Sequence, residues 1–251
     1  MLPLSEIYRN SIADEKVALD RINFPGTPEI QVKSDEGMLW YYNENMALGE
    51  FFINGNVISC KQHFYRCARI DEYLINNYDS RILDSGINHI TYALLSDNTE
   101  LIARYADLSH SVYKWMVEHG YSTLLYCIQQ IMKDNWEGVK RSIEIMNTKN
   151  AKLRKGILSD ISFFEALLEK NESKMFECIN QLLKDHKKRN KYLGISEQYI
   201  SIPALTYTKL AWLKGFELQI DHPLIPKELL PYCPLEKYDD KYDFLAKDTF
   251  F

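Results

Sequence analysis

The chain has 251 residues, of which 46% are hydrophobic and 26% are charged. This composition is typical of a folded domain with a sizeable apolar core, and it argues against global disorder. The net charge of -5 provides no broad basic field, so we expect no nucleic-acid partner. A mildly acidic protein is instead suited to basic partners, which include many nucleases.

The cysteines and histidines show no metal-binding pattern. The five cysteines are scattered without a CxxC motif, and no two of the six histidines lie four residues apart. We therefore favour reduced thiols in the core and expect no metal site. The common phosphate, dinucleotide and calcium motifs are also missing, so we expect no cofactor.

The ends of the chain and its longest apolar runs bear on its location. The N-terminus has no charged segment followed by an apolar run, and no stretch approaches the roughly 18 to 20 apolar residues of a membrane span. We therefore expect a cytoplasmic protein with no membrane partner. Nothing in the sequence indicates an oligomeric state.

Helices are predicted for most of the chain. No proline occurs between Pro28 and Pro203, which is the condition that long helices need. Apolar residues recur at helical spacing, and the alternation typical of strands is nowhere sustained. This spacing predicts helices, in chain order, at residues 4–21, 36–53, 56–77, 82–95, 98–117, 121–133, 135–147, 152–169, 172–189 and about 201–215.

A repeat becomes visible when three turns are aligned on Asn98, Asn135 and Asn171, which are 37 and 36 residues apart. Each asparagine is followed by apolar residues four and eight positions later, and a weaker fourth copy starts at Asn56. A period of this length indicates antiparallel helix pairs that stack, although chance similarity between amphipathic helices is the alternative. We predict an all-α fold in which helix pairs stack as an α-solenoid or TPR-like array, with a single domain over residues 1–231.

Residues 232–251 follow as an acidic and aromatic tail. Aromatic side chains provide anchors at protein interfaces, and carboxylates steer the approach of a basic partner. The alternative is that the rings fold back onto the last helix pair while the carboxylates face water. The candidate partner-binding residues in this tail are Tyr238, Asp239, Asp240, Tyr242, Asp243 and Phe244.

One pair of residues suggests a catalytic alternative. Arg104 and His110 are separated by five residues, a spacing found in helical ribonucleases of the HEPN class. The histidine would then transfer a proton while the arginine stabilised charge on the phosphate. Chance spacing and the acidic balance of the chain argue against this hypothesis.

The C-terminal third resembles a family of bacterial immunity proteins, the immunity protein 49 type of polymorphic toxin systems. The resemblance rests on three segments in order: a helix that ends in Leu182-Leu183-Lys184-Asp185-His186, a helix that opens with Ile202-Pro203-Ala204-Leu205 and runs to Lys214-Gly215-Phe216, and the segment from Asp221-His222-Pro223 to Leu229-Leu230. It implies a protein that binds and neutralises a cognate toxin as a stoichiometric complex, without enzymatic activity. It implies no particular interface residues.

Overall fold

The computed structural model describes residues 2–149, 151–190 and 194–246. Within these ranges the protein is an α-helical fold with fifteen α-helices, two short 3-10 helices and no strand. The all-α prediction is therefore confirmed. Helix pairs do pack against their neighbours, but the TPR-like detail of the prediction is not confirmed.

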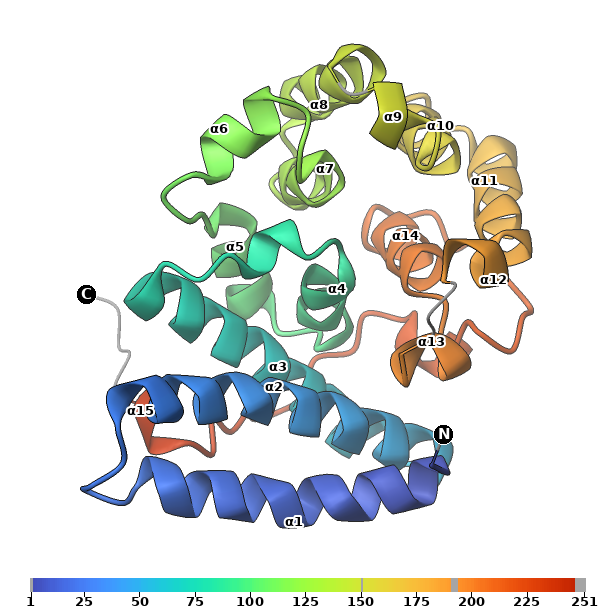
Figure 1. The fold of residues 1–251 in the computed structure, drawn as a ribbon. Coiled ribbons are helices and arrows are strands. Elements are labelled where there is room, and N and C mark those ends of the chain that lie inside the picture. Colours follow the sequence, from blue (N-terminus) through green and yellow to red (C-terminus); the bar gives the residue numbers. More distant parts are fainter. Residues whose placement is uncertain (1, 150, 191–193, 247–251) are drawn as a thin grey trace.

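Three long antiparallel helices form one end of the molecule (Figure 1). The second of them begins seven residues earlier than predicted, because Pro28 lies directly before its first turn and residues 29–35 continue the helical spacing. Asp35 and Glu36 are buried within it, and Asp35 pairs with Arg21 of the preceding helix. The three helices are α1 (Leu4–Ile22), α2 (Glu29–Phe52) and α3 (Val57–Tyr78).

The middle of the chain is divided into shorter helices than predicted. Residues 108–112 form a loop because the Asp79 carboxylate accepts a hydrogen bond from the backbone N–H of Ser111. Gly86, with φ of +98°, separates a short 3-10 turn from the helix that follows it. The elements are η1 (Ile82–Asp84), α4 (Asn88–Leu95), α5 (Thr99–Asp107), α6 (Tyr113–Glu118), α7 (Thr123–Met132), α8 (Trp136–Thr148), α9 (Ala151–Arg154), α10 (Leu158–Leu168), α11 (Glu172–Lys184), α12 (His186–Arg189) and α13 (Ser196–Tyr199).

The repeated asparagines all start helices, as their alignment predicted. The side chains of Asn98, Asn135 and Asn171 each accept a hydrogen bond from the backbone N–H three residues later. The residue before each one has a left-handed backbone, with φ between 53° and 58°. Asn56 follows the same pattern after Gly55. One left-handed residue that ends a helix, followed by a capping asparagine, is thus the common turn of these hairpins.

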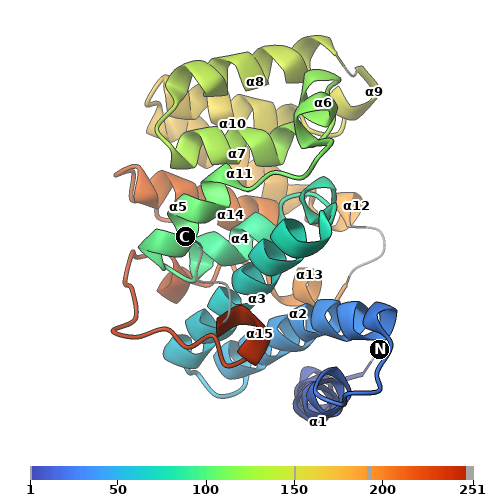
Figure 2. The same ribbon diagram turned by 90° about the vertical axis from the view of Figure 1, so that its left-hand side faces the viewer.

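The last long helix, α14 (Ile202–Leu213), lies on the inner side of the arc that α7, α8, α10 and α11 describe (Figure 1). It contacts α4, α10 and α11, and nine of its twelve residues are buried. Figure 2 shows it at mid-height, between the layer of α1 to α3 and the upper helices. Helical-repeat proteins commonly bind partners on their concave surface. In this protein a helix of the same chain lies there.

Thiols and membrane spans can be compared with the sequence predictions. Cys60, Cys67, Cys127 and Cys178 are buried, whereas Cys233 is exposed, so the prediction of core thiols was wrong for the last of the five. All five are free thiols. In the part of the chain that the structure describes, no helix is long and apolar enough to cross a membrane, and no group of three or more metal-ligating side chains forms a candidate metal site.

Candidate partner-binding site

The predicted tail is the first candidate for a functional surface. After α14 the chain is mostly irregular, with only η2 (Lys227–Leu229) and α15 (Asp243–Ala246) as short helices. Four prolines between residues 223 and 234 remove backbone donors and prevent a longer helix here. The segment passes α4 and ends beside α3, where α15 makes its contacts (Figure 2). We call residues 232–246 the strap.

A buried lysine cluster of Lys61, Asp97 and Lys209 holds residues 229–233, which lead into the strap. Lys209 Nζ donates to the carbonyl oxygens of Leu229, Leu230 and Pro231 at 2.9, 3.0 and 3.2 Å, and it lies 2.6 Å from Asp97 Oδ1. Burial lowers the pKa of Lys209.

Asp97 also connects the cluster to α3. Lys61 Nζ donates to Asp97 Oδ2 at 2.6 Å and to the carbonyl oxygen of Cys233 at 2.9 Å. The three side chains of the cluster are at most 3% exposed. Two cations therefore share one carboxylate, and the backbone carbonyl groups of residues 229–233 complete their hydrogen bonds.

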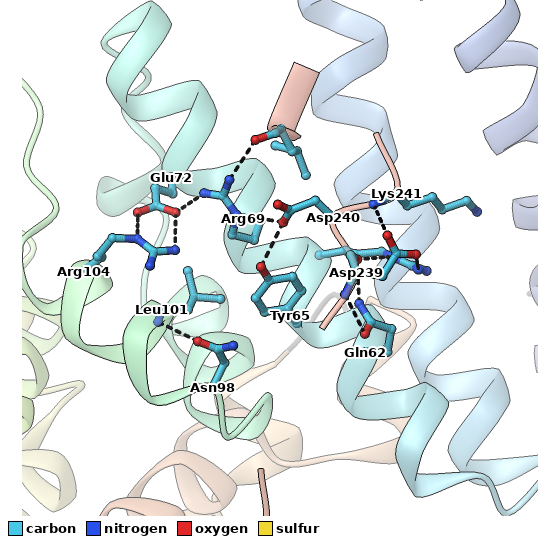
Figure 3. Close-up of polar contacts among 12 residues, drawn as sticks. Gln62, Tyr65, Arg69, Glu72, Asn98, Leu101, Arg104, Asp239, Asp240 and Lys241 are labelled. Atoms are coloured by element: carbon cyan, nitrogen blue, oxygen red, sulfur yellow. Dashed lines mark hydrogen bonds and ion pairs between the residues drawn. The ribbon is translucent and has the colours of Figure 1, made fainter. Parts of the chain in front are cut away.

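The middle of the strap is held by the backbone and the carboxylate of Asp239. Its carbonyl oxygen accepts from Gln62 Nε2 at 2.8 Å and from Arg66 Nε at 3.2 Å (Figure 3). Its carboxylate pairs with Arg66 Nη2 at 3.0 Å while the side chain stays 64% exposed. The backbone N–H of Lys241 and the Arg66 guanidinium lower the pKa of this carboxyl group. Asp239 is therefore a carboxylate in a fixed position at the surface.

Asp240 extends the contact with α3. Its Oδ1 lies 2.9 Å from both Arg69 Nε and Tyr65 Oη, and burial together with this carboxylate raises the pKa of Tyr65. Arg69 also pairs with Glu72, and it donates to the carbonyl oxygen of Leu245 at 3.0 Å. Figure 3 shows this guanidinium between the two carboxylates. The end of the strap is thus tied to the charged side chains of α3.

Tyr242 anchors the strap to α1 and α2. It is 2% exposed, and its hydroxyl donates to Glu15 Oε1 at 2.5 Å and accepts from Asn43 Nδ2 at 2.6 Å. Lys241 Nζ pairs with Glu15 at 2.6 Å. Burial is the main cause that raises the pKa of Tyr242. The ring of Phe244 stacks on that of Tyr242 with centroids 5.6 Å apart, so both rings are part of the intramolecular packing.

The six candidate residues therefore divide into two groups. Tyr238, Asp240, Tyr242 and Phe244 make contacts within the protein, Tyr238 by donating to the carbonyl oxygen of Ser96 at 2.7 Å. Asp239 and Asp243 are exposed, although Asp239 also pairs with Arg66. The tail does fold back, but onto α3 and the N-terminal helices rather than onto the last helix pair. Partner binding by these residues stays a prediction, and Phe250 and Phe251 lie outside the described residues.

Sequence reasoning missed the side chains that receive the strap. They lie on α3, where Lys61, Arg66 and Arg69 bring three cations to one helix. All three are buried, which is unusual for basic side chains and requires acidic or carbonyl partners. The sequence did contain a signal for this contact: several basic residues lie in one amphipathic helix, and the chain also has an acidic tail that could pair with them.

The catalytic alternative can be compared with the geometry of Arg104 and His110. Arg104 makes two hydrogen bonds to Glu72 of α3, at 2.6 and 3.2 Å (Figure 3). His110 is 4% exposed, and its Nε2 lies 3.2 Å from Asp84 Oδ1 in η1. The two residues therefore have separate carboxylate partners on different elements, and each contact connects neighbouring elements of the fold.

The protein is thus an all-α scaffold, and its acidic C-terminal segment is fixed on the surface of that scaffold. The family model for immunity protein 49 matches residues 63–229, about two thirds of the chain. The chain therefore belongs to the immunity protein 49 family, and the resemblance stated from its C-terminal third is confirmed. No curated protein and no solved structure matches the chain. The matched range includes Asp97 and Lys209, whereas α1, α2 and the strap lie outside it.

Proposed function

We propose that this protein binds a cognate bacterial toxin in a stoichiometric complex and thereby neutralises it in the cytoplasm of the bacterial cell that makes both. Membership of the immunity protein 49 family supports the toxin as the partner. The structural observation that carries the proposal is the strap, whose acidic outer side is held in place by buried contacts.

Charge is distributed unevenly along the chain. Residues 216–246 contain seven Asp and Glu residues and three Lys residues, a net charge of -4 out of -5 for the whole protein. The strap itself contains four of these carboxylates and two lysines, a net charge of -2. Its exposed charged residues are Glu236, Asp239 and Asp243 together with Lys237 and Lys241. A concentrated acidic surface accelerates association with a basic partner and disfavours acidic ones. The strap is therefore suited to a basic toxin, and a nuclease is the type that we favour.

Preorganisation adds to this argument. The carboxylate of Asp239 is exposed, while its backbone is bonded to Gln62 and Arg66 on a buried helix. A partner that binds such a group loses little conformational freedom, because the loop is already ordered before the encounter. A strap anchored at Tyr242 and at the lysine cluster thus presents its carboxylates in one arrangement.

The test is co-expression with the product of the adjacent upstream gene, followed by affinity purification and a growth-rescue assay. A strap variant combines Glu236→Gln, Asp239→Asn and Asp243→Asn. Its matched control removes three exposed carboxylates elsewhere, with Asp107→Asn, Glu118→Gln and Glu144→Gln.

We expect the strap variant to lose roughly tenfold or more in affinity, mainly through slower association and with a weaker salt dependence. The control should bind as the wild type does. Equal losses in both variants would show that the strap is not the interface. If the wild-type protein neither forms a complex nor rescues growth, the proposed function is wrong for that partner.

A further inference from the structure

Basic residues gather at the edge of the molecule where α10 begins and α11 ends. Residues 151–159 contain three basic residues and no carboxylate, and residues 184–189 contain four basic residues and one carboxylate, Asp185. The two segments meet in space, because Lys155, Asp185 and Lys188 line the same hollow of about 490 Å³. Figure 2 shows α9 and α12, which belong to these segments, on the right-hand side of the molecule. A chain with a net charge of -5 therefore carries a concentrated basic surface.

Six of these seven cations are exposed and have no partner within the fold. Among the described residues, none of the six makes an ion pair or a hydrogen bond through its side chain. Lys133, Lys140 and Lys174, by contrast, each pair with a carboxylate. The seventh cation, Arg189, is bonded at 2.8 and 3.1 Å to the buried carboxylate of Asp160. We call the six the basic edge: Lys152, Arg154, Lys155, Lys184, Lys187 and Lys188.

The fold gains little from these charges. Lys184 lies in the last turn of α11, where a cation is favourable beside the negative end of the helix dipole. Lys155 and Lys188 instead line the hollow together with Leu158 and Ser159, the first two residues of α10. A cation at this positive end of a helix is unfavourable, and unpaired like charges repel one another. The stability of the fold therefore does not account for the basic edge.

Leucine side chains lie among the cations. Leu153 and Leu158 are 46% and 52% exposed, and Leu158 lines the hollow beside Lys155 and Lys188. An exposed leucine gains free energy when it enters the boundary between the headgroups and acyl chains of a bilayer, and anionic headgroups attract nearby lysines. Sites for single-stranded nucleic acids add aromatic rings that stack on the bases, whereas none of the described residues that line this hollow is aromatic. The combination of leucine and lysine favours a lipid surface.

We propose that the basic edge attaches the protein to membrane surfaces that contain anionic lipids. The cations lie against the phosphate headgroups, while Leu153 and Leu158 enter the boundary between headgroups and acyl chains. The sequence predicted no membrane partner because it contains no membrane span, but attachment to a membrane surface requires none. The strap passes along the left-hand side in Figure 2, away from α9 and α12, so membrane attachment leaves it accessible. No toxin is needed for this attachment.

The first test uses the full-length protein and lipid vesicles. Co-sedimentation measures binding to phosphatidylcholine vesicles with and without about one third phosphatidylglycerol, at low and at high salt. The edge variant combines Lys152→Gln, Lys155→Gln and Lys188→Gln. Its matched control makes the same change in net charge outside the basic edge, with Lys133→Gln, Lys140→Gln and Lys174→Gln.

We expect binding to the anionic vesicles alone, weaker binding at high salt, and an affinity at least tenfold lower in the edge variant. The control should bind as the wild type does. Equal binding to neutral vesicles would overturn the proposal. Equal losses in the two variants would also overturn it, because the total charge and not the basic edge would then decide binding.

Leu153→Ser with Leu158→Ser tests the apolar contact without a change in charge. Ile12→Ser with Val17→Ser is the control, because these two residues of α1 are 45% and 49% exposed. We expect roughly tenfold weaker vesicle binding in the leucine variant and wild-type binding in the control. Unchanged binding of the leucine variant would mean that the bilayer interior is not entered, and the membrane assignment would be wrong.

Two soluble probes distinguish a membrane from other anions. Glycerol phosphate is added to the vesicle assay as a competitor, and a single-stranded RNA oligonucleotide is titrated into the protein at the same salt concentration. We expect glycerol phosphate to leave vesicle binding unchanged, since one small anion cannot replace a charged surface together with an apolar boundary. Displacement by glycerol phosphate, or binding of the RNA more tightly than the vesicles with a loss in the edge variant, would replace the membrane by a phosphate or nucleic-acid ligand.

Discussion

Two regions fasten the same C-terminal segment, and they do so in different ways. The buried lysine cluster holds residues 229–233 through contacts that are almost fully excluded from water. The middle of the strap is held by ion pairs in which Asp239 and Asp240 keep 64% and 29% of their side chains exposed, before the buried Tyr242 anchors its end. The strap and Lys61 lie outside the range matched by the family, whereas Asp97 and Lys209 lie inside it.

Under the proposed function, this difference separates the scaffold from the proposed interface. Buried cations that bind backbone carbonyl groups are intolerant of change, because each lost partner leaves an unsatisfied polar group in the core. Exposed ion pairs contribute little to stability and can be exchanged at little cost. Under the proposed function, the strap could therefore change with the toxin while α14 and the lysine cluster preserve the fold.

The largest expected effect is that of Lys209→Met. This change leaves three carbonyl oxygens and part of Asp97 without their donor, so we expect the free energy of unfolding to fall by about 3 to 5 kcal/mol. Urea denaturation measures it. Lys214→Met is the control, because Lys214 pairs with an exposed Asp134 and should contribute no more than about 1 kcal/mol. Similar losses in both variants would contradict the comparison.

The second effect depends on pH. Burial, with the cations Arg66 and Lys241 nearby, lowers the pKa of His63 to about 3 from an ordinary value of 6.5. The unfolded chain therefore binds a proton below about pH 6.5 that the folded protein does not bind until about pH 3, and stability falls as the pH decreases between these values. The loss from this group at about pH 5 should reach up to about 2 kcal/mol.

His63→Gln isolates this contribution. The histidine lies 2.9 Å from Asn43 Oδ1, and Asn43 in turn binds the hydroxyl of Tyr242, so the group belongs to the anchor of the strap. Glutamine can donate a similar hydrogen bond without titrating. Denaturation curves at neutral pH and at about pH 5 should show a smaller acid loss in the variant. Parallel pH profiles for the two proteins would contradict this account.

Tyr242→Phe removes one hydroxyl from the anchor. We expect a loss of about 1 to 2 kcal/mol, because Glu15 and Asn43 each lose a buried hydrogen bond. Limited proteolysis should also cut the strap faster in this variant. Tyr232→Phe, which removes an exposed hydroxyl paired with Thr99, is the matched control and should unfold as the wild type does.

The smallest effect on stability is expected for Asp239→Asn. Its exposed ion pair with Arg66 should contribute no more than about 1 kcal/mol, while the backbone contacts with Gln62 remain. Thermal unfolding at low and high salt measures this contribution. A loss as large as that of Lys209→Met would mean that the strap is as much a part of the scaffold as the lysine cluster.

Local features of this protein could be predicted from the sequence because they depend on neighbouring residues. The helix starts at Asn98, Asn135 and Asn171 are examples, since a capping side chain bonds to the backbone three residues later. Two of the three segments on which the resemblance rests are residues 202–216 and 221–230, and the structure places them at α14 and at the carbonyl groups that Lys209 binds. The position of Lys209 inside the largely apolar helix α14 was the sequence signal for this buried contact.

Other features were decided by contacts between distant parts of the chain. The inner position of α14 follows from apolar surfaces on α4, α10 and α11 that no local pattern connects. The strap lies on α3 because Asp239 and Asp240 meet Arg66 and Arg69 more than 170 positions away in the sequence. The sequence by itself therefore determined the helical class, the hairpin turns and the family, because these depend on short-range hydrogen bonds and periodicity. The burial of Tyr242 and the basic edge were decided by the tertiary structure, since burial and the clustering of charges depend on which distant surfaces meet.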